Sequence, residues 1–240
     1  MNWNWHVIVE YFPELLKAAP LTLQLVFIAC AVGLVFGIIL GVLRVSDNIF
    51  IKGLPFLYIF FFRGTPLLVQ MFLIYYGLSQ FEVVKNSSLW EPVLSKPYWC
   101  AIIAFSLNTS AYIGEIVRGA IMSIPKGELE AADAMGMSTV QKFTRIILPR
   151  AFGIMLPAYS NELIFMLKGS ALASTITMMD ITGAARTIAA KTYTPLELLF
   201  AAGIIYLLLA WMIMFGFNIL ERLFNRHKFY VPPEVAKAKA

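Results

Sequence analysis

Charged residues are scarce in this chain. Its 240 residues are 60% hydrophobic and only 14% charged, whereas soluble domains are about a quarter charged. A fold of this size leaves much of its area exposed, so it cannot bury that much apolar surface. The excess must face lipid, which excludes a soluble enzyme, a disordered tail and a secreted disulfide scaffold.

Cysteine and histidine are almost absent. Cys30 and Cys100 lie within apolar runs, where we expect small buried hydrophobic residues and neither a disulfide nor a metal site. His6 and His227 lie at opposite ends of the chain, which leaves no cluster for metal or triad chemistry. The sequence also lacks a glycine-rich phosphate loop with a lysine. We therefore expect no enzymatic activity and no bound cofactor.

Long apolar segments are abundant instead. A membrane-spanning helix needs roughly 20 mostly apolar residues, and this criterion predicts five spans in one transmembrane domain over residues 1–240. The expected spans cover about residues 21–43, 54–81, 97–119, 151–168 and 198–220. The first is too long for a cleavable signal. An odd number of spans puts the two termini on opposite sides of the membrane.

Lysine and arginine determine the predicted orientation. They concentrate in the loop after the third span and in the C-terminal tail, at Arg118, Lys126, Lys142, Arg145, Arg150, Arg222, Arg226, Lys228, Lys237 and Lys239. The positive-inside rule therefore makes these segments cytoplasmic and the N-terminus periplasmic. The net charge of +5 then reflects topology and contact with anionic membrane lipids. The sequence contains no stripe of basic residues interleaved with aromatic residues, so nothing in it indicates nucleic-acid binding.

The polar segment over residues 125–149 has the pattern of two short helices. Gly136 can adopt the left-handed conformation that ends a helix. Ser138 and Gln141 form a capping-box pattern that predicts the start of a second helix, which Pro149 is expected to stop. The sequence thus predicts a cytoplasmic helix-turn-helix. A plain connector between two spans is the alternative.

This segment resembles the coupling motif of the membrane subunits of ABC importers. The likeness consists of Glu130-Ala131-Ala132, three residues, Gly136, nine residues, and then Ile146-x-Leu148-Pro149. In that family the two short helices sit in a groove of a cytoplasmic ATPase. The small alanines allow close approach, and the glycine allows a tight turn. The resemblance implies ATPase-coupling roles for Glu130, Ala131, Ala132, Gly136 and Met137.

Other segments resemble the polar amino-acid permeases of that family, namely residues 63–70, 108–115 and 159–162. The whole chain is similar to the M-type membrane subunit of bacterial histidine/arginine/lysine/ornithine and opine importers. The resemblance implies an all-α integral membrane protein of the bacterial inner membrane, a five-helix type I ABC importer permease. It also implies three kinds of partner: a second, Q-type permease, two copies of a cytoplasmic ATPase, and a periplasmic amino-acid-binding protein.

Polar residues inside the spans mark a candidate substrate site. An ionisable group near the bilayer centre costs roughly 2.5–3.5 kcal/mol, so it is a functional candidate, and Glu162 lies near the middle of the fourth span. Asn108, Tyr112 and Glu115 follow i, i+4, i+7 spacing on the third span and share a helical face. The substrate-binding residues that we expect are Glu162, Asn108, Tyr112, Asn161 and Ser170. A structural clamp to the partner permease is the alternative for Glu162.

Gly169 departs from the family pattern. Many related permeases carry aspartate at this position, in a Lys-Asp-Ser run, so one anionic contact of the wider family is missing here. Either the Q-type partner supplies the main binding pocket, which we favour, or Ser170 and backbone groups serve instead.

Arg63 interrupts the second apolar segment and has two interpretations. Residues 64–81 are long enough to span alone, so Arg63 would mark the cytoplasmic start of that helix. Alternatively, Arg63, Thr65 and Pro66 belong to an inner gate where the helix is broken.

Two further expectations concern neighbouring segments. Glu115 and Arg118 are three residues apart, which predicts a helical ion pair near the cytoplasmic interface. Residues 169–197 are too polar to span the membrane and are expected to pack at the periplasmic mouth.

These features predict a permease subunit that imports polar amino acids by ATP-driven alternating access. Basic ones (arginine, histidine, lysine, ornithine or related opines) are the favoured substrates. An ion-coupled secondary transporter or channel subunit is the alternative, because it would also explain an intramembrane carboxylate. Such a transporter would be expected to show internal inverted repeats, and none is evident in the sequence.

Overall fold

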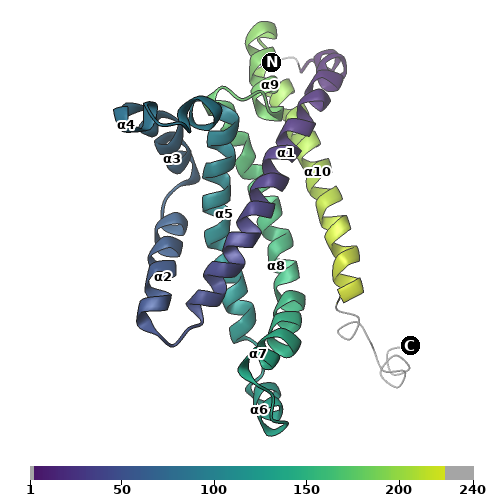
Figure 1. Ribbon diagram of the computed structural model, residues 1–240. Helices are drawn as coiled ribbons and strands as arrows, with labels where there is room; N and C mark the ends of the chain where they lie inside the picture. The colour runs from purple at the N-terminus through teal and green to yellow at the C-terminus, as the bar shows by residue number, and fades with distance from the viewer. Residues whose placement is uncertain (1–2, 225–240) are drawn as a thin grey trace, which may run out of the picture.

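The computed structural model describes residues 3–224, which form helices joined by short turns and contain no strand (Figure 1). The α-helices are α1 (Trp5–Arg44), α2 (Ile49–Gly64), α3 (Leu67–Phe72), α4 (Glu82–Lys85), α5 (Pro97–Met122), α6 (Lys126–Ala134), α7 (Thr139–Lys142), α8 (Leu148–Gly169), α9 (Ile181–Thr192) and α10 (Pro195–Phe224). Wider turns occur at Leu73–Gly77, Trp90–Leu94 and Phe143–Ile147, and tighter ones at Leu78–Gln80 and Ser170–Ile176. The all-α prediction is confirmed.

The long helices α1, α5, α8 and α10 run between two ends of the molecule (Figure 1). The short helices α6 and α7 form a hairpin at one end, drawn at the bottom of the figure. Helices α3, α4 and α9 lie at the other end, together with the start of α1. The tail residues Arg226, Lys228, Lys237 and Lys239, and His227, lie outside the described residues.

Within residues 3–224, three helices are long and apolar enough to cross a membrane on their own, namely α1, α5 and α10. Two bent pairs also meet the criterion: α2 with the segment that begins at α3, bent by 103°, and the stretch through α8 with α9, bent by 49°. The number of spans reaches the predicted five when each bent pair is one span. The exact count of five stays a prediction.

The first helix is much longer than the predicted span over residues 21–43. Helix α1 has 40 residues, about 60 Å at 1.5 Å per residue, which is twice the roughly 30 Å of a bilayer's hydrocarbon core. Its early turns bury Ile8 and Leu15 against α9 and α10, while Glu10 is half-exposed. The charged residues on one face of this part of the helix interrupt the apolar sequence. The predicted span, which required an uninterrupted apolar segment, therefore began too late, at residue 21.

The second predicted span, 54–81, is not one helix. Helix α2 ends at Gly64, and Thr65 and Pro66 are extended (φ −114°, ψ 146° and φ −64°, ψ 135°) before α3 begins. Proline lacks an amide hydrogen and disfavours helical geometry in the residue before it. Pro66 thus interrupts the apolar segment inside the bundle.

The hairpin follows the prediction up to its last residue. Ser138 and Gln141 form both hydrogen bonds of a capping box at the start of α7, and Gly136 is left-handed with a φ of +73°. The expectation that Pro149 stops the second helix was wrong. It lies in the first turn of α8, where a missing amide hydrogen costs little, and the chain stays helical from α7 through a wide turn into α8.

Three glycines bring α1 and α5 close together. A Cβ atom on Gly37 would lie 2.6 Å from Ile113 Cγ2, and one on Gly41 would lie 2.6 Å from Val117 Cβ. Gly33 approaches Thr109 in the same way. Small residues spaced by four let membrane helices pack closely. This spacing is visible in the sequence, but our sequence analysis missed it.

Candidate functional site

A cavity of about 690 Å³ lies between the break after α2 and the middle parts of α5 and α8. Its lining brings together seven residues that the sequence analysis assigned separately to substrate binding or to a gate. They are Arg63, Thr65, Pro66, Asn108, Tyr112, Asn161 and Glu162. The remaining lining is mostly apolar: Gly64, Leu67, Ile116, Ala158, Phe165 and Met166.

Two amide side chains stabilise the break between α2 and α3. Gln70 Nε2 donates to Phe62 O at 2.8 Å and contacts both oxygens of Thr65, at 3.0 and 2.7 Å. Asn108 Nδ2 donates to Gln70 Oε1 at 2.9 Å and to Phe62 O at 3.3 Å. A broken helix in a membrane must satisfy its freed carbonyls within the protein. These two amides do so, and they also fix α2 against α5.

Gln70 is a positioning residue that the sequence analysis did not select. It is 3% exposed and is the only amide side chain between Pro66 and Phe72. A buried amide in an apolar segment, shortly after a proline, is the signal that would have identified it.

Replacing Gln70 by leucine is expected to destabilise the protein by about 1–3 kcal/mol, because buried carbonyls lose their donor. Thermal melting of the purified protein in detergent measures this. The control is Gln80→Leu, since Gln80 is exposed and its amide reaches Tyr76 O only at 3.3 Å. Equal melting temperatures for the two variants would show that the Gln70 contacts do not support the break.

Glu162 provides the carboxylate of the cavity. It is 6% exposed, and its Oε1 accepts a hydrogen bond of 2.8 Å from Thr109 Oγ1 on α5. Thr109 is a further residue that the sequence analysis did not assign to the site, although it directly follows Asn108. The Thr109 hydroxyl fixes the orientation of the carboxylate, and the other carboxylate oxygen has no hydrogen bond among the described residues.

Arg63 does not lie at the start of a cytoplasmic helix. It belongs to the last turn of α2, and the helix rises about 21 Å between Ile49 and Arg63. Its guanidinium carbon lies 5.2 Å from the centre of the Tyr112 ring, and no ion pair of the described residues involves it. The break at Pro66, which ends α2 inside the bundle, is the reason that Arg63 reaches the cavity.

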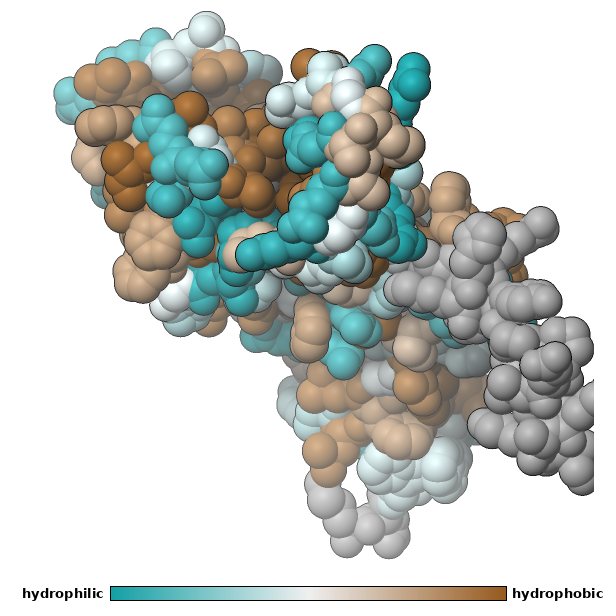
Figure 2. All heavy atoms as spheres, turned by 90° about the horizontal axis from the view of Figure 1, so that it is seen from below, coloured by the Kyte–Doolittle hydropathy of each residue, from teal (hydrophilic) through white to brown (hydrophobic). Residues whose placement is uncertain are grey.

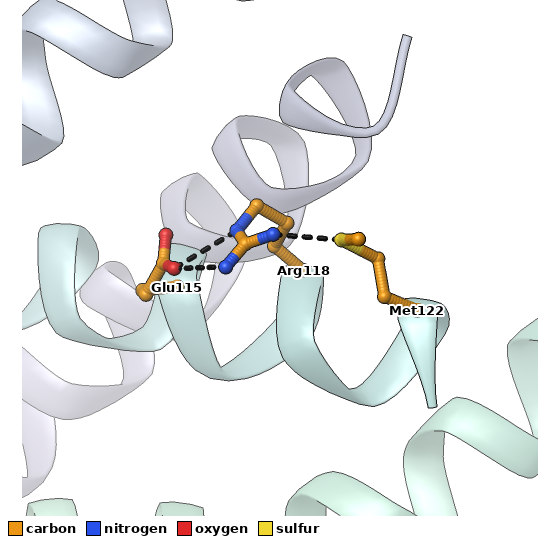
Figure 3. Close-up of polar contacts among 3 residues, drawn as sticks. All are labelled: Glu115, Arg118 and Met122. Carbon is orange, nitrogen blue, oxygen red and sulfur yellow. Dashed lines mark hydrogen bonds and ion pairs between the residues drawn. The ribbon is translucent and has the colours of Figure 1, made fainter. Parts of the chain in front are cut away.

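Ser170 and Glu115 do not line the cavity. Ser170 is fully buried, and its hydroxyl donates to Leu167 O at 2.7 Å. Glu115 accepts hydrogen bonds from Arg118, whose Nε lies at 2.9 Å, and Arg118 also contacts the sulfur of Met122 (Figure 3). The predicted ion pair of Glu115 and Arg118 is confirmed. On α5, the cavity wall continues from Tyr112 to Ile116 instead.

Gly169 also lies beyond the cavity lining. A Cβ atom there would lie 3.1 Å from Leu67 Cδ2, so a larger residue at this position would press on the first turn of α3. Where related permeases carry an aspartate, this chain has Gly169, and the end of α8 packs closely against α3 at that residue.

The hairpin residues Glu130, Ala131, Ala132, Gly136 and Met137 lie at the far end of the molecule from α9. Ala132 is buried, whereas Met135 and Val140 are 72% and 71% exposed. The molecule seen from this end shows hydrophilic residues with hydrophobic ones among them (Figure 2). Single exposed apolar side chains are common on protein surfaces, so the ATPase-coupling role of the hairpin stays a prediction.

Among the described residues, no group of three or more His, Cys, Asp or Glu side chains could hold a metal ion. The titratable groups of the cavity are one carboxylate, one guanidinium and one phenol. This arrangement suits binding of a ligand that carries both charges.

Comparisons with known proteins show the family to which this chain belongs. A family model described as "Binding-protein-dependent transport system inner membrane component" matches residues 33–229. The octopine transport system permease protein OccM of Rhizobium meliloti is 48% identical over 212 residues, 88% of this chain and 86% of that protein. The histidine/lysine/arginine/ornithine transport system permease protein HisM of Salmonella typhimurium is 40% identical over 228 residues, 92% of this chain and 97% of that protein.

Solved structures are similar as well. A chain from the crystal structure of an amino acid ABC transporter with histidines has a TM-score of 0.82 at 32% identity, covering 92% of this chain and 99% of that chain. A chain of the inward-facing MetNI methionine ABC transporter has a TM-score of 0.73 at 19% identity, covering 94% of this chain and 100% of that chain. The second likeness concerns the fold alone.

Proposed function

This chain belongs to the family of binding-protein-dependent transport system inner membrane components, and we propose that it forms the substrate path of an ATP-driven importer. It is a permease subunit of a polar amino-acid or opine ABC importer, a multi-pass protein of the inner membrane. The resemblance to M-type permeases is confirmed by its HisM and OccM relatives.

The observation that carries the proposal is the presence of one carboxylate and one guanidinium in a single cavity within the bundle. Glu162 binds a cationic group of the substrate, and Arg63 binds its carboxylate. Asn108, Tyr112 and Asn161 hydrogen-bond the remaining polar atoms. Every amino acid carries both charges, and a basic one adds a cation near Glu162.

Keeping both ionisable groups inside a membrane domain is costly. An isolated charge at the bilayer centre costs roughly 2.5–3.5 kcal/mol on insertion scales, so such groups mark substrate pathways. Neither Glu162 nor Arg63 belongs to an ion pair of the described residues. A zwitterionic substrate supplies the missing partner of each.

The α6–α7 hairpin couples this cavity to ATP hydrolysis. Two copies of a cytoplasmic ATPase bind ATP, dock on the hairpin and move it. Helix α8 begins next to the hairpin and carries Glu162, so this movement exposes the cavity alternately to the two sides. A Q-type permease completes the pair of membrane subunits, and a periplasmic binding protein delivers the substrate. The hairpin end and the C-terminus face the cytoplasm, and the N-terminus faces the periplasm.

The test is reconstitution of the chain with these partners in proteoliposomes, where ATP-dependent uptake of arginine, histidine or an opine is expected. Gly136→Val should lower the substrate taken up per ATP hydrolysed. A Cβ at this position meets nothing within 4 Å, so the substitution acts through the φ of +73°. Such a backbone costs a side-chain-bearing residue about 1–2 kcal/mol.

The matched control is Gly127→Val on the same hairpin, where a Cβ also meets nothing within 4 Å and the backbone is not left-handed. This variant is expected to keep its coupling. Uptake that continues without ATP but needs an ion gradient would contradict the proposed importer and support a secondary transporter.

A further inference from the structure

An ion pair ties the hairpin directly to the helix that carries Glu162. Arg150 Nε donates to Glu128 Oε2 at 3.0 Å, and its Nη2 donates to Glu128 Oε1, so the contact has two points. The pair joins α6 to the first turn of α8 across 22 residues of sequence. A two-point contact of this kind defines orientation as well as distance.

Helix α8 extends from this contact to the cavity. It has 22 residues and is continuous across Pro157, and it rises about 18 Å between Arg150 and Glu162. Any tilt of α6 that Arg150 follows therefore reaches the carboxylate of the cavity through one helix.

The second helix of the hairpin, α7, continues into α8 through the wide turn at Phe143–Ile147, so it is α6 that needs a side-chain link to α8. The other side-chain contacts of the hairpin do not supply a directional link. Lys142 pairs with Asp133, which closes the hairpin on itself. Leu129 packs among apolar residues with buried Ala151 and Met155, and such contacts are non-directional. Among the ion pairs of residues 3–224, only the Glu128–Arg150 pair connects the hairpin with α8.

The electrostatics of the pair suit a permanent connection. The Arg150 guanidinium lowers the pKa of the Glu128 carboxyl. A lowered pKa keeps Glu128 ionised at neutral pH, so the pair is lost only when the pH falls through the lowered pKa of the Glu128 carboxyl. Both side chains are partly exposed, and exposed ion pairs contribute little to overall stability. Breaking the pair should therefore change coupling and leave the protein folded.

We infer that the Glu128–Arg150 pair transmits movement of the ATPase-docking hairpin to α8 and thereby to Glu162. This inference rests on the proposed function. Glu128 and Arg150 are positioning residues, because neither lines the cavity. Without the pair, the ATPase still hydrolyses ATP and still docks, but α6 tilts without turning α8.

The experiment measures substrate uptake per ATP hydrolysed in proteoliposomes with the full complex. Glu128→Arg and Arg150→Glu are each expected to lower this ratio by at least about fivefold, the lower end of typical coupling between sites. The double variant Glu128→Arg/Arg150→Glu, which restores opposite charges, is expected to recover it to within about twofold. The control Glu10→Arg reverses a similar exposed acid at the other end of the molecule and should leave the ratio unchanged.

The outcomes separate this inference from the proposed function. If the unmodified complex shows no ATP-driven uptake, the proposed function fails. If uptake is normal and both single variants keep the full ratio, only the transmission by this pair is wrong. It is equally wrong if the singles are impaired and the double variant does not recover. Melting temperatures close to that of the unmodified complex are expected for all variants.

Discussion

Replacing Glu162 by glutamine is expected to reduce uptake of basic amino acids by about 100-fold, because losing one partner of a buried charge pair costs about 2–5 kcal/mol. The substrate cation then enters a cavity whose remaining ionic group is the Arg63 guanidinium. Glutamine keeps the size of the side chain, and its carbonyl can still accept the Thr109 hydroxyl that Glu162 accepts. We therefore expect the variant to fold and assemble normally.

The measurement is ATP-dependent uptake of radiolabelled arginine, together with recovery of the intact complex. Glu197→Gln is the matched control, since Glu197 is also buried, at 8% exposure, but lies in α10. Among residues 3–224, its side chain accepts a hydrogen bond from the Asn4 amide alone. It should transport nearly as well as the unmodified protein. Unchanged uptake by the Glu162 variant would remove this carboxylate from the substrate site and leave a purely structural role.

Replacing Gly37 by leucine is expected to prevent stable folding. Its Cβ would lie 2.6 Å from Ile113 Cγ2, 2.7 Å from Ile113 Cβ and 3.1 Å from the backbone nitrogen of Gly114. The last atom cannot move without displacing α5. Inserting atoms into a packed core costs typically 1–3 kcal/mol, and a leucine against backbone should exceed that range. The amount of full-length protein in the membrane fraction and its melting temperature report the effect.

Gly203→Leu in α10 is the control, because a Cβ there meets nothing within 4 Å, and this variant should accumulate normally. Normal accumulation of Gly37→Leu would mean that α1 and α5 do not pack as closely as described.

Local features were the ones that could be predicted. The capping box at Ser138 and the left-handed Gly136 depend on residues within a few positions of each other, and both are present. The same holds for the pair of Glu115 and Arg118. Pro149 was misjudged because one proline is compatible with a helix end and with a helix start, and the neighbouring elements decide between them.

The sequence alone determined that the chain is an α-helical membrane protein with a polar hairpin between two apolar helices, because composition and local spacing carry that information. The tertiary structure decided which polar residues meet. Arg63 reaches Tyr112 and the cavity of Glu162 only because α2 breaks within the bundle, and that break is stabilised by Gln70 and by Asn108 from α5. Hydrogen bonds between residues far apart in the chain satisfy the broken backbone, so the depth of a side chain in the bundle cannot be read from its own helix.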